Sequence, residues 1–324
     1  MGIDTVRSRL RPAKLDFQSF DLRSPDVWQL LGGVDTVVHL AFSREPSRNV
    51  NTQHELNVAG FRNVLDAAQR AGVSKFVYGS SGYVYGAHAD NPGILGEDDP
   101  MRPNAGLAAA EQHADNEAWL SDWVSKHPET QTTVLRFGRM VGPDVGGSLS
   151  RALAAQRFPT VAGYRPPQQV LHPDDAAGAL VQFTLGDHRG VFNVCADDAV
   201  AIDEILQRLD KPALELPGAA AVPIRELAWK LRVSDIPAAE IEYMMFPTVM
   251  ANDRARSQGW VPKYSSEETF QAAIASLRDR ADRGEPHFGR LRSLATRWAD
   301  AAIGSAVAAY NGHRSRKRAR LLRS

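Results

Sequence analysis

The side chains that could carry proton-transfer chemistry gather in two segments. Ser81, Tyr83 and Tyr85 follow one another within the stretch KFVYGSSGYVYG at residues 75–86. His113 comes later, in a segment with a helical pattern, and an imidazole can exchange a proton near neutral pH. A lone histidine on a helix is, however, more often a surface residue. These groups predict hydrogen-bonding or acid–base chemistry but do not name a reaction.

The elements that must position these residues alternate between strands and helices. From residue 16 to about residue 202, short β-branched runs alternate with longer helical patterns, which is typical of βαβ units around a parallel sheet. The run at 34–42 is apolar on both faces and predicts a buried strand. Further strands are expected at 75–81, 132–136 and near Val191, with helices at 52–71, 109–126 and 174–185.

The pattern loosens after Arg139, where prolines and glycines divide the chain into short pieces. Residues 196–264 indicate mainly helices joined by proline-containing loops, and a helix is expected at 265–283. We expect a first domain at 1–145 and a second lobe at 146–282. An Arg-rich helical extension with a basic end is expected at 283–324.

Composition limits the class of protein. The chain has 324 residues, of which 43% are hydrophobic and 23% charged, as in globular domains. Lys plus Arg and Asp plus Glu number 38 each, so no global field favours nucleic acid or an anionic membrane. Cys195 is the only cysteine, which excludes a disulfide framework and a Cys-rich zinc site. With no apolar signal core or spanning run, a soluble cytoplasmic protein is expected.

Six short motifs occur in a definite order along the chain. They are DTVVHLA at 35–41, NVAGFRNVL at 57–65, SSGYVYG at 80–86, RFGRMVGP at 136–143, LHPDD at 171–175 and GWVPK at 259–263. In this order they resemble the extended short-chain dehydrogenase/reductase family, the NAD-dependent epimerase/dehydratases typified by UDP-glucose 4-epimerase. The resemblance implies a Rossmann-like, doubly wound parallel sheet with a smaller, mainly helical C-terminal substrate lobe. It makes residues 1–145 an incomplete dinucleotide-binding domain and residues 146–282 mostly a substrate-binding lobe.

The resemblance also implies a site at the carboxyl ends of the strands, where ligands of open parallel sheets bind. Ser81 falls where the family hydrogen-bonds the reacting sugar oxygen. The implied ligands are NAD or NADP and a nucleotide-sugar-like small molecule. The residues expected near the cofactor in the central motifs are Ala41, Phe42, Asn57, Ser80 and Phe137.

Three more residues are expected at the adenosine end of the cofactor. Asp21 and Leu22 resemble the pair that contacts adenine, and Asp4 falls where an acidic residue would bind the ribose hydroxyls. Simpler interpretations stay open here. Asp21 could be an ordinary turn carboxylate, and Asn57 and Asn63 could be surface amides of a helix.

The glycine-rich loop of the family is absent from this sequence. The motif G-x-x-G-x-x-G binds the pyrophosphate between the first strand and the first helix. The only glycines before Gly60 are Gly2, Gly32 and Gly33, and none fits that position. If residues 1–4 end the second strand, the first β-α unit, about 30 residues long, is missing. We therefore expect a shortened chain and a sheet that has lost a central strand.

The family's Y-x-x-x-K catalytic pair is absent as well. The relevant helix should follow Pro103, and its two possible registers place Leu107 and Glu111, or Ala109 and His113, at the Tyr and Lys positions. None of the seven tyrosines has a lysine four residues later. Catalytic competence is therefore doubtful, with His113 as the remaining candidate for acid–base work. The alternatives are a non-catalytic dinucleotide-dependent regulator or scaffold and a fragment that cannot fold alone.

Three further expectations concern metals and partners. His172, Asp174 and Asp175 look like metal ligands, but the family begins a helix there, so no metal is expected. The helix at 52–71 is a candidate face for a homodimer. The basic end HRSRKRARLLR could contact an acidic partner, although a solvated terminus is the simpler interpretation.

Overall fold

The computed structural model describes most of the chain. The described residues are 1–5, 15–43, 50–142, 145–231 and 237–283. The expected Arg-rich extension at 283–324, with its basic end, lies almost wholly outside these residues. No helix within the described part is long and apolar enough to cross a membrane.

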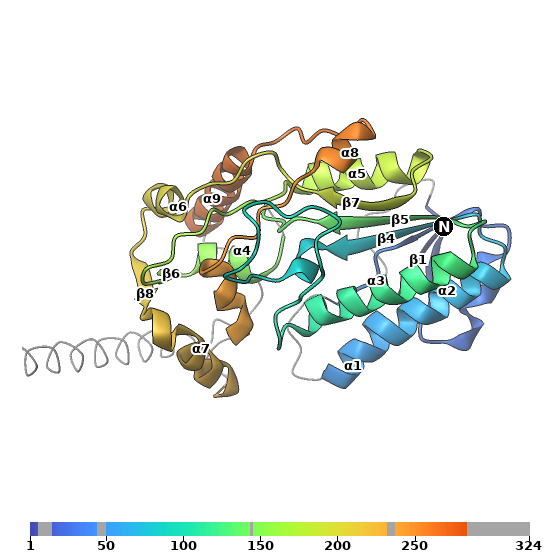
Figure 1. Ribbon diagram of the computed structural model, residues 1–324, viewed down its shortest axis with the longest axis horizontal. Coiled ribbons are helices and arrows are strands. Elements are labelled where there is room, and N and C mark those ends of the chain that lie inside the picture. Colours follow the sequence, from blue (N-terminus) through green and yellow to red (C-terminus); the bar gives the residue numbers. More distant parts are fainter. Residues whose placement is uncertain (6–14, 44–49, 143–144, 232–236, 284–324) are drawn as a thin grey trace, which may run out of the picture.

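A four-stranded parallel sheet forms the centre of the larger half of the molecule (Figure 1). The strand order is β3-β4-β5-β7, and all three pairings are parallel. The register aligns Ser80 with Arg136 and Ser81 with Phe137, so these side chains reach the same edge of the sheet. The strands are β3 (Thr36–His39), β4 (Lys75–Ser81), β5 (Gln131–Phe137) and β7 (Gly190–Val194).

Helices cover both faces of this sheet, as in a doubly wound fold (Figure 1). On one face, α2 (Gly60–Arg70) and α3 (Ala108–Lys126) bury Phe61, Leu65 and Leu120 against Phe76 and Tyr78. On the other face, α5 (Pro173–Leu185) buries Phe183 against Val77, Leu135 and Phe192. Because strand side chains alternate, Phe76 and Val77 contact opposite layers. The expected Rossmann-like architecture is therefore confirmed.

The segment before β4 is one helix with a change of pitch. It begins as α1 (Val50–His54), continues through the π-helical η2 (Glu55–Ala59) and ends as α2. Gly72 follows with a φ of 71°, a left-handed conformation that favours glycine. The sequence predicted this helix and its end.

The first two strands form a sheet of their own. Strand β1 (Gly2–Asp4) pairs in parallel with β2 (Phe17–Ser19), and the 3-10 helix η1 (Pro25–Leu31) follows. Within the described residues, no strand pairs with the free edge of β3. Val38 on β3 is accordingly 36% exposed. The prediction of a buried strand at 34–42 is thus only partly right, because β3 is shorter and forms an edge.

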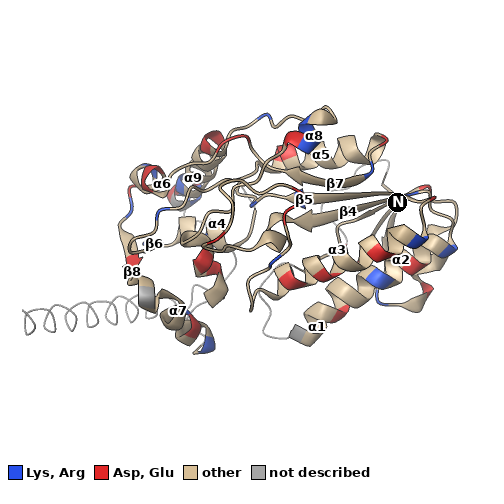
Figure 2. Ribbon diagram, viewed as in Figure 1, with Lys and Arg blue, Asp and Glu red and all other residues tan. Residues whose placement is uncertain are grey.

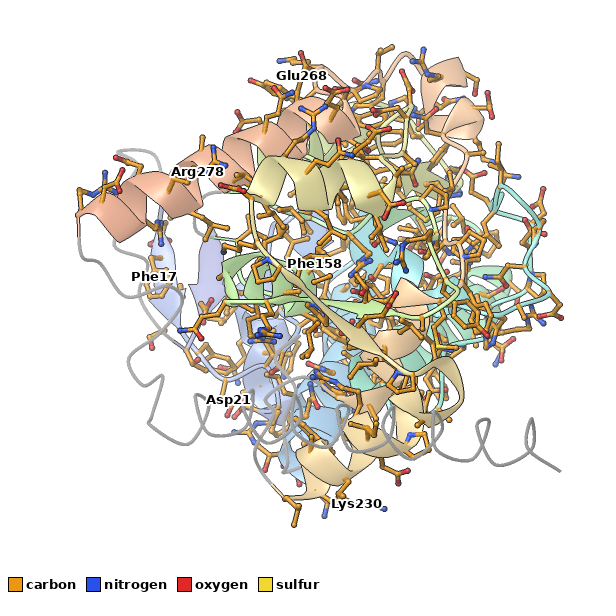
Figure 3. All side chains as sticks on the ribbon, turned by 90° about the vertical axis from the view of Figure 1, so that its left-hand side faces the viewer. Phe17, Asp21, Phe158, Lys230, Glu268 and Arg278 are labelled. Carbon is orange, nitrogen blue, oxygen red and sulfur yellow. The ribbon has the colours of Figure 1, made fainter. Side chains whose placement is uncertain are left out.

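The second half of the molecule is a lobe with its own core, which includes the fully buried Phe158 (Figure 3). Figure 3 places Lys230 and Glu268 at its surface. A two-stranded parallel sheet, β6 (Phe158–Val161) with β8 (Ala213–Leu216), was not expected from the sequence. The helices are α4 (Ser148–Ala154), α6 (Ile202–Leu209), η4 (Gly218–Ala220), α7 (Ala221–Lys230), η5 (Ala238–Met244), α8 (Asp253–Ser257) and α9 (Ser266–Asp282).

Charged side chains of both signs are interspersed over the helices (Figure 2). Most of the ion pairs lie at the surface, such as Arg165 with Asp203 and Lys230 with Glu226. Such exposed pairs contribute little to stability. The exception is the pair of Arg136 and Glu117, which lies beside the site.

Candidate functional site

A cavity of about 570 Å³ opens where the carboxyl ends of β4 and β5 meet the lobe. We call it the cleft. Ser81, Phe137 and Arg139 line it from the sheet side, and Trp229 and Glu240 line it from the lobe. A cavity of this size at this edge is where open parallel sheets bind small ligands.

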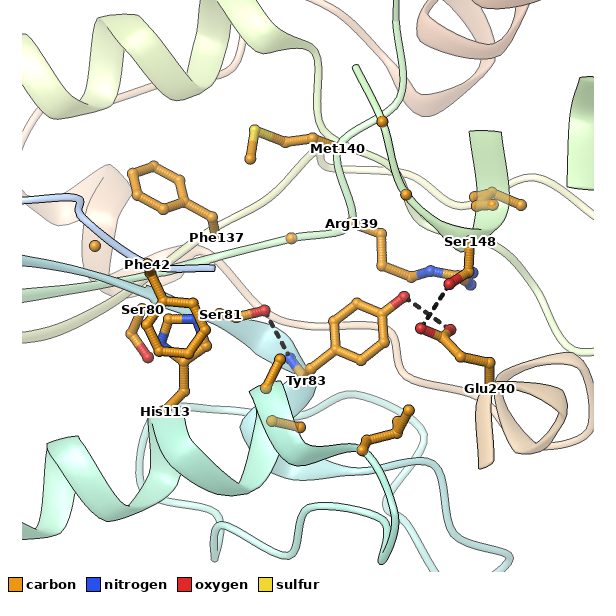
Figure 4. Close-up of a pocket in the computed structure, with 18 of the residues that line it drawn as sticks. Phe42, Ser80, Ser81, Tyr83, His113, Phe137, Arg139, Met140, Ser148 and Glu240 are labelled. Atoms are coloured by element: carbon orange, nitrogen blue, oxygen red, sulfur yellow. Dashed lines mark hydrogen bonds between the residues drawn. The ribbon is translucent and has the colours of Figure 1, made fainter. Parts of the chain in front are cut away.

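Ser81 lies in the cleft at the end of β4 (Figure 4). Its hydroxyl accepts a hydrogen bond from the backbone N–H of Tyr83 at 3.3 Å and so caps η3 (Gly82–Tyr85). Ser80 also borders the cleft, but its hydroxyl donates to the buried carboxylate of Glu117. The two neighbouring serines therefore differ. Ser81 lies in the cavity, whereas the hydroxyl of Ser80 binds β4 to Glu117 on α3.

The first two turns of α3 carry both registers considered for the missing catalytic pair. Ala109 and His113 both line the cleft, one helical turn apart. In the other register Leu107 lines the cleft but Glu111 does not, and Glu111 accepts a hydrogen bond from the backbone N–H of Gly106 instead. The geometry thus brings both members of only one register, Ala109 and His113, into the cavity that Ser81 lines.

His113 is buried, so the interpretation of a surface histidine is wrong. Its ring stacks on Phe42 with a centroid separation of 3.6 Å (Figure 4). Its Nδ1 lies 2.7 Å from the hydroxyl of Tyr78, which also accepts a hydrogen bond from the amide of Asn116. Nδ1 is the acceptor that the described residues offer to the Tyr78 proton. With Nδ1 as the acceptor, the ring carries a proton on Nε2.

Asn57 is fully buried and is not a surface amide. Its Oδ1 accepts from the backbone N–H of Ser43 at 2.7 Å, and its Nδ2 donates to the Ser43 carbonyl and to Gln112. It therefore holds the segment after β3, which carries Ala41 and Phe42, against α3. Asn63 similarly donates to backbone carbonyls, those of Leu22 and Ser24.

The three residues expected near adenosine lie apart from the cleft lining, on and after the β1-β2 sheet. Asp21 accepts hydrogen bonds from the backbone and guanidinium of Arg23, which lower the pKa of its carboxyl. Its neighbour Leu22 packs partly buried against the α2 layer. Asp4 accepts a backbone hydrogen bond from Phe20 at its carbonyl. Their roles toward a cofactor stay predictions.

The sequence did not indicate a polar group at the lobe end of the cleft. The carboxylate of Glu240 accepts hydrogen bonds from the hydroxyls of Tyr83, at 3.3 Å, and Ser148, at 2.7 Å (Figure 4). Burial raises the pKa of the Tyr83 phenol well above its ordinary value, while the nearby Arg139 opposes the rise. Tyr83 is therefore protonated at neutral pH.

Behind the cleft, a buried network joins α3 to the sheet. The guanidinium of Arg136 forms an ion pair with Glu117 at 2.7 Å, and both side chains are about 5% exposed. Arg136 also donates to the hydroxyl of Tyr85, which in turn donates to Asn193 on β7. Tyr85 is thus a structural residue, because its hydroxyl is used inside the protein.

The segment that looked like a metal site has structural partners. Nδ1 of His172 accepts from the backbone N–H of Asp174 and caps α5. The carboxylate of Asp175 accepts from the backbone N–H groups of Lys263 and Tyr264. Across the described part of the chain, no group of three or more His, Cys, Asp or Glu side chains could hold a metal ion.

A search of protein families gives the decisive match. The sequence profile of the NAD dependent epimerase/dehydratase family matches residues 3–195. The chain belongs to this family. The family is NAD-dependent, so the expected cofactor class agrees with the match.

Individual relatives of this epimerase/dehydratase chain extend over much of its length. An uncharacterized protein of Mycobacterium tuberculosis is 28% identical over 299 residues, covering 89% of this chain and 79% of its own. A dTDP-glucose 4,6-dehydratase of Streptomyces griseus is 34% identical over 213 residues, 63% of this chain and 62% of its own. The Thermus thermophilus UDP-glucose 4-epimerase, solved in complex with NAD, has a TM-score of 0.63 at 19% identity, covering 85% of this chain and 90% of its own. This structure supports the fold alone.

Proposed function

We propose that the cleft binds a nucleotide-sugar-like small molecule next to a nicotinamide dinucleotide, and that the chain senses this pair instead of converting it by the family's usual proton transfer. The observation that carries the proposal is the placement of Ala109 and His113 opposite Ser81 in one cavity. The hydroxyl of Ser81 would hydrogen-bond a sugar oxygen. A methyl group at residue 109 cannot donate or accept a proton.

The described residues fit one end of the dinucleotide. Phe42, Ser80 and Phe137 border the cleft at the strand ends and would form the walls around its nicotinamide half. NAD or NADP would supply hydride-transfer chemistry when bound. Within the described residues, no glycine-rich turn joins β1 to a helix, so no fit is found for the pyrophosphate. We therefore derive no reaction step through the cofactor.

An enzymatic role is the second candidate, and His113 is the residue that would carry it. The hydrogen bond from Tyr78 holds Nδ1, so that proton exchange would take place at Nε2. Loss of a positioned acid or base typically lowers a rate by about 10²–10⁴-fold. If His113 performs this work, His113→Ala must abolish turnover while leaving ligand binding measurable.

The binding proposal is tested with NADH and UDP-glucose. Saturable changes in NADH fluorescence and saturable heat with UDP-glucose are expected for the wild-type chain, without conversion of UDP-glucose. The absence of saturation with both ligands would contradict the proposal. Conversion of UDP-glucose that His113→Ala removes would establish the enzymatic alternative.

The proposal about the missing pair is tested by restoring it. In the variant Ala109→Tyr/His113→Lys, a phenol and an ammonium group replace the methyl and imidazole in the cleft. We expect NAD-dependent turnover of UDP-glucose to appear or rise by at least about tenfold. Leu107→Tyr/Glu111→Lys is the matched control, since Leu107 lines the cleft but Glu111 does not, so that only the phenol would enter the cavity. Equal activity in both variants would show that this register is wrong.

Two partner expectations stay proposals. A homodimer through the helix of residues 50–70 predicts twice the chain mass in light scattering, and Arg62→Glu on that helix should lower it. Arg62 stacks on Trp119, which is 42% exposed on the neighbouring α3. An acidic partner for the basic end predicts salt-sensitive binding that is lost when residues 314–324 are removed.

A further inference from the structure

Arg139 is a half-buried cation in the wall of the cleft, and one of its N–H groups has no partner among the described residues. Its Nη1 donates to Oε1 of Gln168 at 2.7 Å. Its Nε is buried and has no hydrogen-bond partner among the described residues. A guanidinium has five N–H donors, and a buried donor without a partner costs free energy. The side chain therefore lacks an acceptor that a ligand could supply.

Two aromatic rings lie near this guanidinium. Its carbon lies 5.9 Å from the ring centroid of Tyr83 and 5.7 Å from that of Tyr243, distances at which a ring attracts a cation. The Tyr83 phenol also has a hydrogen-bond interaction with the guanidinium. Gln168 takes Nη1, which leaves Nε for a ligand, on the edge that it shares with Nη2. Two parallel N–H groups on one edge match the two oxygens of a carboxylate or a phosphate.

The charges around Arg139 allow an anion to enter. Arg139, Arg151 and Glu240 are the charged side chains among the described residues that line the cleft, apart from the imidazole of His113. The hydroxyls of Tyr83 and Ser148 already donate to the Glu240 carboxylate, which reduces its repulsion of a second anion. Figure 4 shows these groups converging at one end of the cleft.

We propose that Arg139 binds an oxyanion of the ligand in the cleft. This inference rests on the proposed function, since the ligand is taken to be nucleotide-sugar-like. The oxyanion is either a carboxylate on the sugar or the diphosphate that joins sugar to nucleoside. Both offer paired oxygens to the Nε–Nη2 edge, so the experiment must separate them.

The experiment measures the affinity of the full chain for three ligands by calorimetry, with NAD⁺ in excess. The ligands are UDP, UDP-glucose and UDP-glucuronic acid, which share the diphosphate while only the last has a carboxylate. We expect Arg139→Gln to weaken binding about 10- to 100-fold, the usual effect of losing a charged hydrogen-bonded pair. Arg157→Gln is the matched control, because Arg157 is exposed and outside the cleft lining.

The pattern over the three ligands identifies the oxyanion. A loss confined to UDP-glucuronic acid assigns Arg139 to the sugar carboxylate, and an equal loss for all three assigns it to the diphosphate. Unchanged affinities in a folded Arg139→Gln variant would overturn the inference. The proposed function would still stand in that case, provided that the wild-type chain binds UDP-glucose. Wild-type chain that binds none of the three would overturn both.

A second variant and a wild-type measurement cover the case in which Arg139→Gln does not fold. Arg139→Lys keeps the charge but loses the paired N–H edge, so an intermediate loss of about 3- to 10-fold is expected. Wild-type chain should bind UDP-glucuronic acid at least about tenfold more tightly than UDP-glucose if the carboxylate is the group recognised. Equal affinities of wild type and Arg139→Lys for all three ligands would overturn the inference.

Discussion

Two parts of one helix, α3, differ in what they do. Around Glu117, the helix is bound to the sheet by a buried ion pair and by hydrogen bonds that reach β4 and β5. One and two turns earlier, His113 and Ala109 line the cleft. One part of the helix is thus bound to the sheet, whereas the other presents side chains to the cavity. The fold therefore depends on contacts that the chemistry does not need.

The largest effect is expected where the supporting network is broken. Glu117→Gln leaves the buried guanidinium of Arg136 without its counter-charge, and removal of one partner of a buried pair costs about 3–5 kcal/mol. Urea unfolding should show this loss. Asp115→Asn, an exposed carboxylate on the same helix, should change the free energy of unfolding by less than about 0.5 kcal/mol. Similar effects in both variants would remove the contrast between the two parts of α3.

His39, a buried histidine of β3 outside the cleft lining, should make the stability of the fold depend on pH. Burial lowers the pKa of His39 to about 4, from an ordinary value near 6.5. Between these values the unfolded chain binds more protons than the folded one. The contribution of His39 to the free energy of unfolding is therefore complete above pH 6.5. It is lost as the pH falls toward 4, by up to about 3 kcal/mol. Unfolding curves measured between pH 4 and pH 6.5 should show this loss of stability.

His39→Leu is the control for this pH dependence. It should remove the part of the pH dependence that arises from His39, although it alters packing against Phe61 and Phe76. If wild type and variant lose stability in parallel over this range, His39 does not carry the proton linkage.

A smaller loss of stability is expected at Tyr78, a core residue whose hydroxyl contacts His113 in the wall of the cleft. Tyr78→Phe keeps the ring in the core but removes the hydroxyl between His113 and Asn116, which should cost about 1–2 kcal/mol. Nitrogen NMR of the His113 ring should also change, because Nδ1 loses its donor. Tyr264→Phe, at a partly exposed tyrosine, is the matched control and should leave both measurements unchanged.

The smallest loss of stability is expected in the cleft itself. Ser81→Ala removes the cap of η3, which is worth about 1 kcal/mol. It should weaken the binding of UDP-glucose by about 2- to 10-fold, the effect of one neutral hydrogen bond. Ser257→Ala, at an exposed serine of α8, should not affect binding. A large loss of stability with unchanged binding would assign Ser81 to the framework.

The strands and helices around the cleft could be predicted because their patterns are long and regular. Strand β4 has the predicted bounds, and α3 begins one residue earlier than expected. The short strands β6 and β8 were missed, since four residues are too few for a period and Pro159 interrupts the first. The exposed edge of β3 could not be foreseen, because it depends on which strands pair.

The site could be predicted only where motifs marked it. Ser81 and Phe137 belong to recognised motifs, and the structure brings both to the cleft. The burial of His113 depends on Tyr78, 35 residues earlier, and helical spacing alone does not reveal such a neighbour. Glu240 comes from a lobe segment without a motif and reaches Tyr83, 157 residues away, through the tertiary fold.

The separate β1-β2 sheet has a consequence for local opening. Its ladder is three residues long and its residues are at most half-buried, whereas all seven residues of β4 pair with β5 and five of them are buried. Regions with few buried contacts open at a lower free energy than the whole domain. Amide protons of β1 and β2 should therefore exchange with solvent deuterium while those of β4 stay protected. The chain would then have a region that opens first, and the cleft would lie on the part that opens last.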